Sequence, residues 1–192
     1  MSRFLAILTV MLVVSAAVTA QEHTSRPSRP APAPTPRIAN DPNDGGWVKF
    51  TSELGRFSVL MPEVPKDKTD TTQTDHGPYT THLFVVRDTS NVYLIGWVDY
   101  DPSFNFRTQS ELAANRDNFV KGIKATLVST RALTIDGYDA LEFVAETSDR
   151  TFKSRVYVVG RRPYQIVIGY PKEQEDPLVT NRFFNSFKIR QY

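Results

Sequence analysis

The stretch from Ala140 to Gly160, ALEFVAETSDRTFKSRVYVVG, alternates apolar and polar residues on both sides of a short polar turn. An alternation of period two places successive side chains on opposite faces of a β-strand. Acids precede the turn and bases follow it. The stretch therefore predicts an antiparallel hairpin with one core face and one charged face.

The register of this hairpin can be predicted from the same pattern. With residues 149–150 as the loop, Glu146 faces Lys153 and Val144 faces Arg155. We interpret this charged side as a solvated face that fixes the register, because a slip of one residue would expose the apolar set. A functional charge cluster is the alternative. The opposite, apolar face carries Leu141, Phe143, Ala145, Ser154, Val156 and Val158.

Similar runs rich in Val, Ile, Tyr, Phe and Thr recur along the chain and are typical of strands. Short turns containing Asp, Ser, Asn or Gly join several of them, and short connections favour antiparallel neighbours. We therefore expect a mainly antiparallel sheet. The further runs are Arg56–Met61, Tyr79–Arg87, Asn91–Tyr100, Ala125–Ile135 and Pro163–Tyr170.

Two segments have helical periodicity instead. Thr108 and Glu111 have capping-box spacing at the start of the first, and Asp176 followed by Pro177 begins the second. We expect both helices to dock on the sheet, although the phenylalanines of the second could also form a ligand-stacking cluster. The apolar stripes comprise Leu112, Phe119, Val120 and Ile123 in the first helix, and Leu178, Val179, Phe183, Phe184 and Phe187 in the second.

The first 46 residues differ in composition from the rest. Residues 1–20 combine one basic residue, a short apolar run and small residues before Gln21, which predicts a signal peptide cleaved after Ala20. An uncleaved anchor is the alternative. Residues 21–46 contain six of the 13 prolines and predict a disordered linker, with a proline-module ligand as the alternative. We therefore expect a single domain over residues 47–192, which is exported to the periplasm or secreted and has no stable membrane span once the signal peptide is cleaved.

Composition excludes several classes of function. The formal net charge is +2 and the basic residues are interleaved with acids, which argues against a nucleic-acid partner. The chain has no cysteine, so disulfides, thiolate metal sites and a cysteine nucleophile are excluded.

No catalytic or cofactor motif is present, so we expect neither an enzyme nor a cofactor. Of three histidines, only His82 lies within a predicted strand, where we expect it to be a partly exposed sheet residue. Asp99 and Asp101 flank Tyr100, but this pair lacks the glycine and distal glutamate of a calcium loop. We therefore predict no catalytic residue and no metal site.

The connection after the strand that ends at Tyr100 carries the candidate binding residues. Pro102 ends the strand pattern, which places Phe104 and Phe106 in a surface connection. They either plug the gap between sheet and helix or stay exposed as anchors for a partner. Interfaces favour aromatic residues near arginine. The predicted binding residues are Tyr100, Phe104, Phe106 and Arg107.

The order of these parts resembles the PsbP/Mog1/DcrB-like superfamily, and within it the exported bacterial members. The residues that carry the resemblance are WVKFTSELGRFSVLMPEVP (47–65), IDGYDALEF (135–143), RVYVVGRRPYQIVIGYP (155–171) and FFNSFKI (183–189). The resemblance implies an α/β/α sandwich: a central antiparallel sheet of six or seven strands with helices on both faces. It also implies a scaffold that docks on partners without a shared active site. No binding residue transfers from the family.

The sequence therefore favours an exported, non-enzymatic interaction or assembly module of the cell envelope, with an unidentified envelope protein as its partner. The alternative is a hydrolase-type enzyme without a recognisable motif, or an envelope protein that binds a small ligand or a metal.

Overall fold

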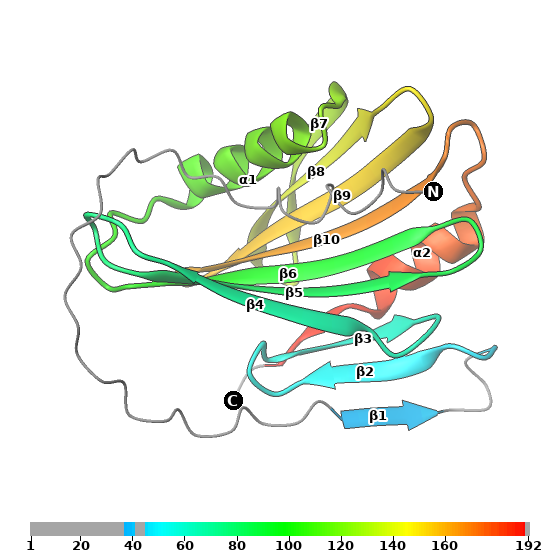
Figure 1. Ribbon diagram of the computed structural model, residues 1–192, viewed down its shortest axis with the longest axis horizontal. Coiled ribbons are helices and arrows are strands. Elements are labelled where there is room, and N and C mark those ends of the chain that lie inside the picture. Colours follow the sequence, from blue (N-terminus) through cyan, green and yellow to red (C-terminus); the bar gives the residue numbers. More distant parts are fainter. Residues whose placement is uncertain (1–36, 41–44, 191–192) are drawn as a thin grey trace.

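The alternating strands assemble into one seven-stranded antiparallel sheet, which is the middle layer of the fold (Figure 1). The computed structural model describes residues 37–40 and 45–190. The strand order is β4-β5-β6-β10-β9-β8-β7. The strands are β4 (Lys66–Thr72), β5 (Tyr79–Arg87), β6 (Val92–Tyr100), β7 (Thr126–Ile135), β8 (Tyr138–Glu146), β9 (Arg150–Val159) and β10 (Arg162–Pro171).

A smaller, four-stranded sheet lies beside the large one, in the order β1-β2-β3-β11. It comprises β1 (Arg37–Asn40), β2 (Val48–Ser52), β3 (Phe57–Met61) and β11 (Lys188–Ile189). Strand β1 pairs with β2 although it lies inside the range expected to be a linker, so that range contains a strand. The expected signal peptide, residues 1–20, lies outside the described residues.

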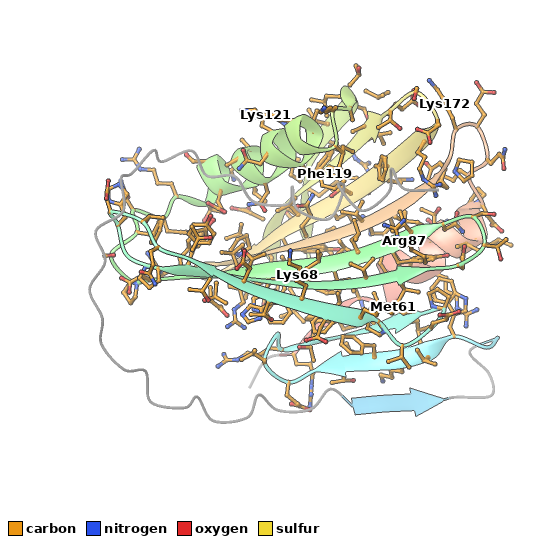
Figure 2. All side chains as sticks on the ribbon, viewed as in Figure 1. Met61, Lys68, Arg87, Phe119, Lys121 and Lys172 are labelled. Atoms are coloured by element: carbon orange, nitrogen blue, oxygen red, sulfur yellow. The ribbon has the colours of Figure 1, made fainter. Side chains whose placement is uncertain are left out.

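Two helices pack on opposite faces of the large sheet (Figure 1), which confirms the predicted α/β/α sandwich. Helix α1 (Thr108–Gly122) covers one face, and helix α2 (Pro177–Ser186) covers the other together with the small sheet. Phe119 points from α1 toward the sheet, while Lys121 lies on the outer side of the helix (Figure 2). No helix among the described residues is long and apolar enough to cross a membrane.

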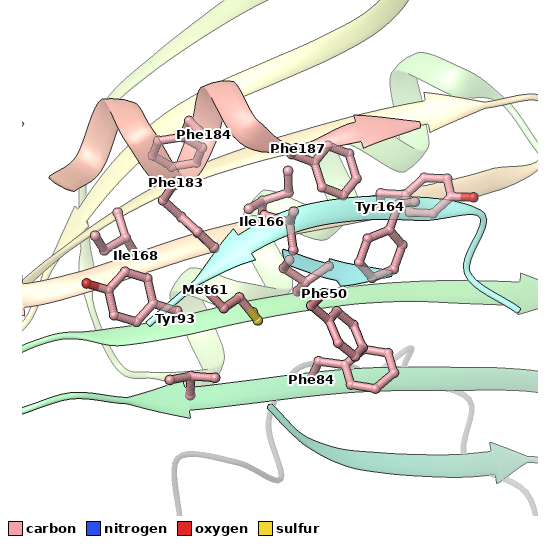
Figure 3. Close-up of a cluster of buried hydrophobic side chains, with 14 of the residues drawn as sticks. Phe50, Met61, Phe84, Tyr93, Tyr164, Ile166, Ile168, Phe183, Phe184 and Phe187 are labelled. Atoms are coloured by element: carbon pink, nitrogen blue, oxygen red, sulfur yellow. The ribbon is translucent and has the colours of Figure 1, made fainter. Parts of the chain in front are cut away.

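Each face of the large sheet has its own hydrophobic core. On the α1 side, Phe119 packs edge-on against Phe143 and Phe152, with ring centroids 5.8 and 5.9 Å apart. On the other side, three phenylalanines in and just after α2 point into the core between the large sheet and the small sheet (Figure 3). These are Phe183, Phe184 and Phe187, all buried. The closing helix is therefore a structural element, as its apolar stripe predicts.

The hairpin between β8 and β9 has the predicted faces but a different register. Glu146 pairs with Thr151 and Val144 with Lys153, and the amide of Thr147 donates to the carbonyl of Arg150 at 2.9 Å. The loop is therefore residues 148–149, and the predicted partners are wrong by two positions. A shift of two preserves the side on which every residue lies.

The charged face of this hairpin is solvated only in part, which corrects the interpretation made from sequence: Lys153 and Glu146 are partly exposed, but one ion pair is largely covered. Glu142 is paired with Arg155 in the sheet, and the two form an ion pair of 2.7 Å. Their side chains are only 12% and 19% exposed. Helix α2 covers them, because the guanidinium carbon of Arg155 lies 4.6 Å from the ring centre of Phe184.

The helix starts agree only in part with the predicted caps. Asp176 caps α2, accepting the amide of Leu178 at 2.9 Å, with Pro177 in the first turn. Leu178 itself is 82% exposed, so its place in the predicted apolar stripe is wrong. Arg107 rather than Thr108 occupies the cap position of α1, and it makes no side-chain cap hydrogen bond.

Candidate functional site

At one end of the large sheet, in and beside the turn between β9 and β10, polar side chains contact segments on both faces of the sheet. Gly160 adopts a φ of +62°, the left-handed conformation that glycine tolerates best, and Arg161 and Arg162 follow it. Successive side chains of an extended chain point to opposite faces. Arg161 accordingly reaches the loop between β6 and α1, whereas Arg162 reaches Asp99 and the small sheet.

Arg161 holds the loop that carries the predicted binding residues. Its Nη2 atom donates to the carbonyl oxygens of Asp101 (3.2 Å), Pro102 (3.4 Å) and Phe104 (2.8 Å). Its guanidinium carbon lies 5.5 Å from the ring centre of Phe106. One exposed arginine therefore fixes both the backbone and an aromatic side chain of this connection.

The structure brings three of the four predicted binding residues into one cluster. The Tyr100 ring lies 5.0 Å from Phe104 and 5.9 Å from Phe106, and Phe104 also contacts Tyr79 at 6.3 Å. We call these four side chains the aromatic corner. Phe104 and Phe106 are half-buried, so each fills part of the gap below the loop and stays partly exposed to solvent. Arg107, the fourth predicted residue, is exposed beside them.

Helix α1 anchors the aromatic corner through Tyr100. Its hydroxyl donates to Oε1 of Glu111 at 2.7 Å. Burial, together with the charge of Glu111, raises the pKa of Tyr100, so the hydroxyl stays protonated and remains a donor. Glu111 is therefore engaged by the sheet and does not complete the capping box expected from sequence.

On the opposite face, Asp99 is the centre of a polar network. It accepts hydrogen bonds from Nε of Arg162 at 2.6 Å and from Nε1 of Trp97 at 3.1 Å, and Nε2 of His82 lies 3.4 Å away. Burial alone would raise the pKa of Asp99, but His82, Arg162 and Trp97 outweigh it and hold the pKa below its ordinary value. Asp99 is therefore a carboxylate held by three strands of the sheet.

His82 is buried, contrary to the expectation of a partly exposed sheet residue. Its ring stacks on Trp97 with centroids 4.3 Å apart and planes 9° from parallel, and Nδ1 lies 3.2 Å from Oγ1 of Thr69. Both ring nitrogens therefore have partners in neighbouring strands. The sequence could not reveal this, because the partners lie 13 or more residues away and meet only through strand pairing.

The two aspartates flanking Tyr100 do not converge. Asp101 accepts from the amide and hydroxyl of Ser103 at 2.9 and 2.7 Å, while Asp99 is bound by the network described above. Within the described ranges, no three histidine or acidic side chains are arranged to hold a metal ion.

A cavity of about 190 Å³ lies beside Arg162, where the small sheet meets the ends of β8, β9 and β10. Three arginines, two tyrosines and two aliphatic residues line it. They are Arg56, Tyr138, Val159, Arg162, Tyr164, Ile189 and Arg190. We call it the arginine pocket. Sequence reasoning missed it because its lining comes from separate segments, and the available signals were only the arginines of ELGR and GRR.

No protein-family profile and no curated protein matches the chain. The structure is similar to the solution structure of cyanobacterial PsbP (CyanoP) from Synechocystis sp. PCC 6803, with 12% identity, a TM-score of 0.47, and coverage of 86% of this chain and 98% of that one. At 12% identity this similarity concerns the fold alone.

A second similar structure is a protein of Bacteroides thetaiotaomicron VPI-5482, solved at 1.50 Å. The two share 13% identity with a TM-score of 0.34, over 71% of this chain and 46% of that chain.

Proposed function

We propose that this chain is an exported, non-enzymatic interaction module of the cell envelope, which docks on a protein partner through the aromatic corner and Arg107. The observation that carries the proposal is that Arg161 fixes the loop between β6 and α1: it donates hydrogen bonds to the carbonyl oxygens of Asp101 and Phe104 and contacts the ring of Phe106. It keeps two half-exposed phenylalanines in place on an otherwise polar surface.

Such a surface has the chemistry of a binding site. Aromatic and arginine side chains supply most of the energy in protein interfaces, and anchors cluster where they can be desolvated. Binding is weakened when loops must become ordered. Because Arg161 already fixes the loop, binding of a partner requires little further ordering of the loop.

The polar groups of the sheet support a binding role over catalysis. A hydrolase would use His82 and Asp99 as a base and its orienting carboxylate. Here both imidazole nitrogens and the carboxylate have partners within the sheet, and His82 is 7% exposed. The network stabilises the pairing of β4, β5, β6 and β10.

The docking surface can be tested by chemical cross-linking of the full chain in an envelope fraction. Arg107→Ala should abolish the cross-linked complex without changing the melting temperature, because Arg107 is exposed. The matched control is Arg87→Ala: Arg87 is exposed at the opposite end of the large sheet (Figure 2) and should leave the complex intact. Equal yields from both variants would contradict the proposed surface.

Export is tested separately. We expect the protein recovered outside the cytoplasm to begin at Gln21, because small residues precede that position. N-terminal sequencing that finds Met1 intact would refute cleavage.

A further inference from the structure

The two edge strands of the large sheet, β4 and β7, differ in composition. Strand β4, KDKTDTT, has four charged residues among seven, whereas β7, TLVSTRALTI, has one charged residue among ten. An edge strand presents unpaired backbone N–H and C=O groups, and charged side chains are one means by which proteins prevent another strand from pairing there. The β4 edge is therefore protected, and β7 is the edge at which a further strand can pair.

The outer side of β7 is accessible. Helix α1 packs against β8, β9 and β10, and every residue of β7 from Thr126 to Ala132 is exposed. Two of these are large and apolar: Leu127 is 37% exposed and Val128 is 56% exposed. Among the described strands, β7 pairs only with β8. One side of the strand is therefore open along its length.

The single charge of β7 does not protect this edge. Nη2 of Arg131 donates to Oε1 of Glu142 at 2.8 Å, and Glu142 is its partner in the neighbouring strand β8. The guanidinium therefore lies over its own sheet, against a carboxylate. It does not extend outward, where it would oppose an incoming strand.

A β-bulge limits the part of β7 that can pair regularly. The register between β7 and β8 shifts between Leu127 and Ser129. A bulge disrupts the ladder locally and increases the twist of its strand. The regular part is therefore residues 129–135. This segment of seven residues is longer than the roughly 5–6 residues of a typical strand.

The regular segment is complementary to itself about a two-fold axis. An axis at its central residue, Ala132, pairs all seven residues with those of a second copy. Ala132 then lies opposite its own equivalent, and Arg131 lies opposite Leu133 of the second copy. No like charges are directly opposite, and the small alanine lets the strands approach. An axis at Arg131 would instead place two guanidinium groups opposite each other, which is destabilising.

We propose that two copies of this chain pair through residues 129–135 of β7, antiparallel about a two-fold axis at Ala132. The two large sheets then form one continuous sheet. A two-fold interface uses the same surface of both copies, so it closes at the dimer. The edges that remain at the two ends are the charged β4 strands. This interface shares no residue with the aromatic corner or Arg107, so it can be present or absent independently of the docking surface.

Analytical ultracentrifugation of the full chain over a concentration series tests this dimer. We expect a dimer whose fraction rises with concentration. Ala132→Lys and Ala132→Glu should each weaken the dimer by at least about tenfold, because each places like charges directly opposite. An equimolar mixture of the two variants should associate again, since lysine then faces glutamate. Ala132 is exposed, so both variants should keep the circular dichroism spectrum of the parent protein. The matched control is Thr72→Lys, which adds the same charge to the exposed β4 and should leave the dimer unchanged.

A disulfide gives a second, independent measurement of the axis. The chain has no cysteine, so Ala132→Cys introduces a single thiol. Opposite Cα atoms of an antiparallel pair are about 4.5–5.5 Å apart, within the range that a disulfide can bridge. Mild oxidation should therefore yield a covalent dimer of Ala132→Cys and none of Thr72→Cys. The proposal is overturned if the parent chain is monomeric at every concentration, if Ala132→Lys associates as the parent does, or if the mixed lysine and glutamate variants fail to associate.

Discussion

Arg155 donates from Nε to Oε2 of Glu142 at 2.7 Å, and the pair lies beneath Phe184 of α2. Glu142 also accepts from Arg131 of β7 at 2.8 Å. One carboxylate therefore connects three neighbouring strands, β7, β8 and β9, under the cover of a helix. A largely covered charge is tolerated only when it is paired and hydrogen-bonded.

Glu142→Gln should lower the free energy of unfolding by about 1–3 kcal/mol, since it leaves the half-buried guanidinium of Arg155 without a counter-charge. The matched control is Arg131→Gln. It removes a partner of the same carboxylate, but Arg131 is 67% exposed, so the loss should stay below about 1 kcal/mol. Urea denaturation of both variants measures the difference. Equal losses would mean that burial of the Arg155 pair is unimportant.

The same pair predicts a pH dependence. Burial raises the pKa of Glu142, but Arg155 and Arg131 outweigh it and hold the pKa below its ordinary value of 4.5. A carboxylate whose pKa is lower in the folded than in the unfolded state stabilises the fold at pH values above its unfolded-state pKa. This stabilisation is lost as the pH falls through its folded-state pKa. Stability should therefore decline below about pH 4.5, and Glu142→Gln should make the decline less steep. Urea titrations from pH 7 to pH 3 test this, and an unchanged slope would contradict it.

The two faces of the β8–β9 hairpin should respond differently to truncation. Phe143 is 1% exposed and packs on Phe119 of α1, so Phe143→Ala should lower stability by about 3–5 kcal/mol. Lys153 makes only a 3.4 Å ion pair with Glu175, so Lys153→Ala should lower stability by well under about 1 kcal/mol. Chemical denaturation of both variants decides this, and similar losses would mean that the faces are misassigned.

The sequence predicts the large sheet well because its signal is local. The predicted run Tyr79–Arg87 has the same bounds as β5, and the faces of the β8–β9 hairpin follow from the alternation of its residues. It does not predict β4, and of the small sheet it predicts only β3, which lies within the run Arg56–Met61. Strand β4, KDKTDTT, is exposed along its length and lacks an apolar alternation, and β11 has two residues. Such strands are specified by their partners rather than by their own pattern.

The sequence likewise predicts the residues of the candidate sites where they are close along the chain, and misses those that meet only in the fold. Tyr100, Phe104 and Phe106 lie within seven residues of one another, so local reasoning finds them. The partner that fixes them, Arg161, is 57 residues from Phe104 along the chain. The arginine pocket is also non-local, because Arg56 and Arg190 meet through the pairing of β3 with β11. Periodicity carries no information about such contacts.

Helix α2 should be required for folding. Its aromatic face closes the core between the two sheets: Phe183 packs on Tyr93 at 5.1 Å, and Phe187, just after the helix, on Phe57 at 5.4 Å. A buried aromatic side chain contributes roughly 150–250 Å² of buried surface. A chain truncated after Asp176 should therefore lose its cooperative thermal transition by circular dichroism. A sharp transition in the truncated chain would show that the helix is dispensable.

The last prediction concerns the aromatic corner. Phe104 contacts Tyr79 and Tyr100, and Phe106 contacts Tyr100 and Arg161, so each ring stabilises the loop from a half-buried position. Phe104→Ser and Phe106→Ser should each lower stability by about 1–3 kcal/mol, less than a fully buried phenylalanine would. At a temperature where both variants remain folded, each should also lose the cross-linked envelope complex, because a ring that anchors a partner is missing. Lower stability with full retention of the complex would show that the rings only fill the gap between sheet and helix. Variants too unstable to fold at any temperature would show that the loop belongs to the core, and the docking surface would then have to be sought elsewhere.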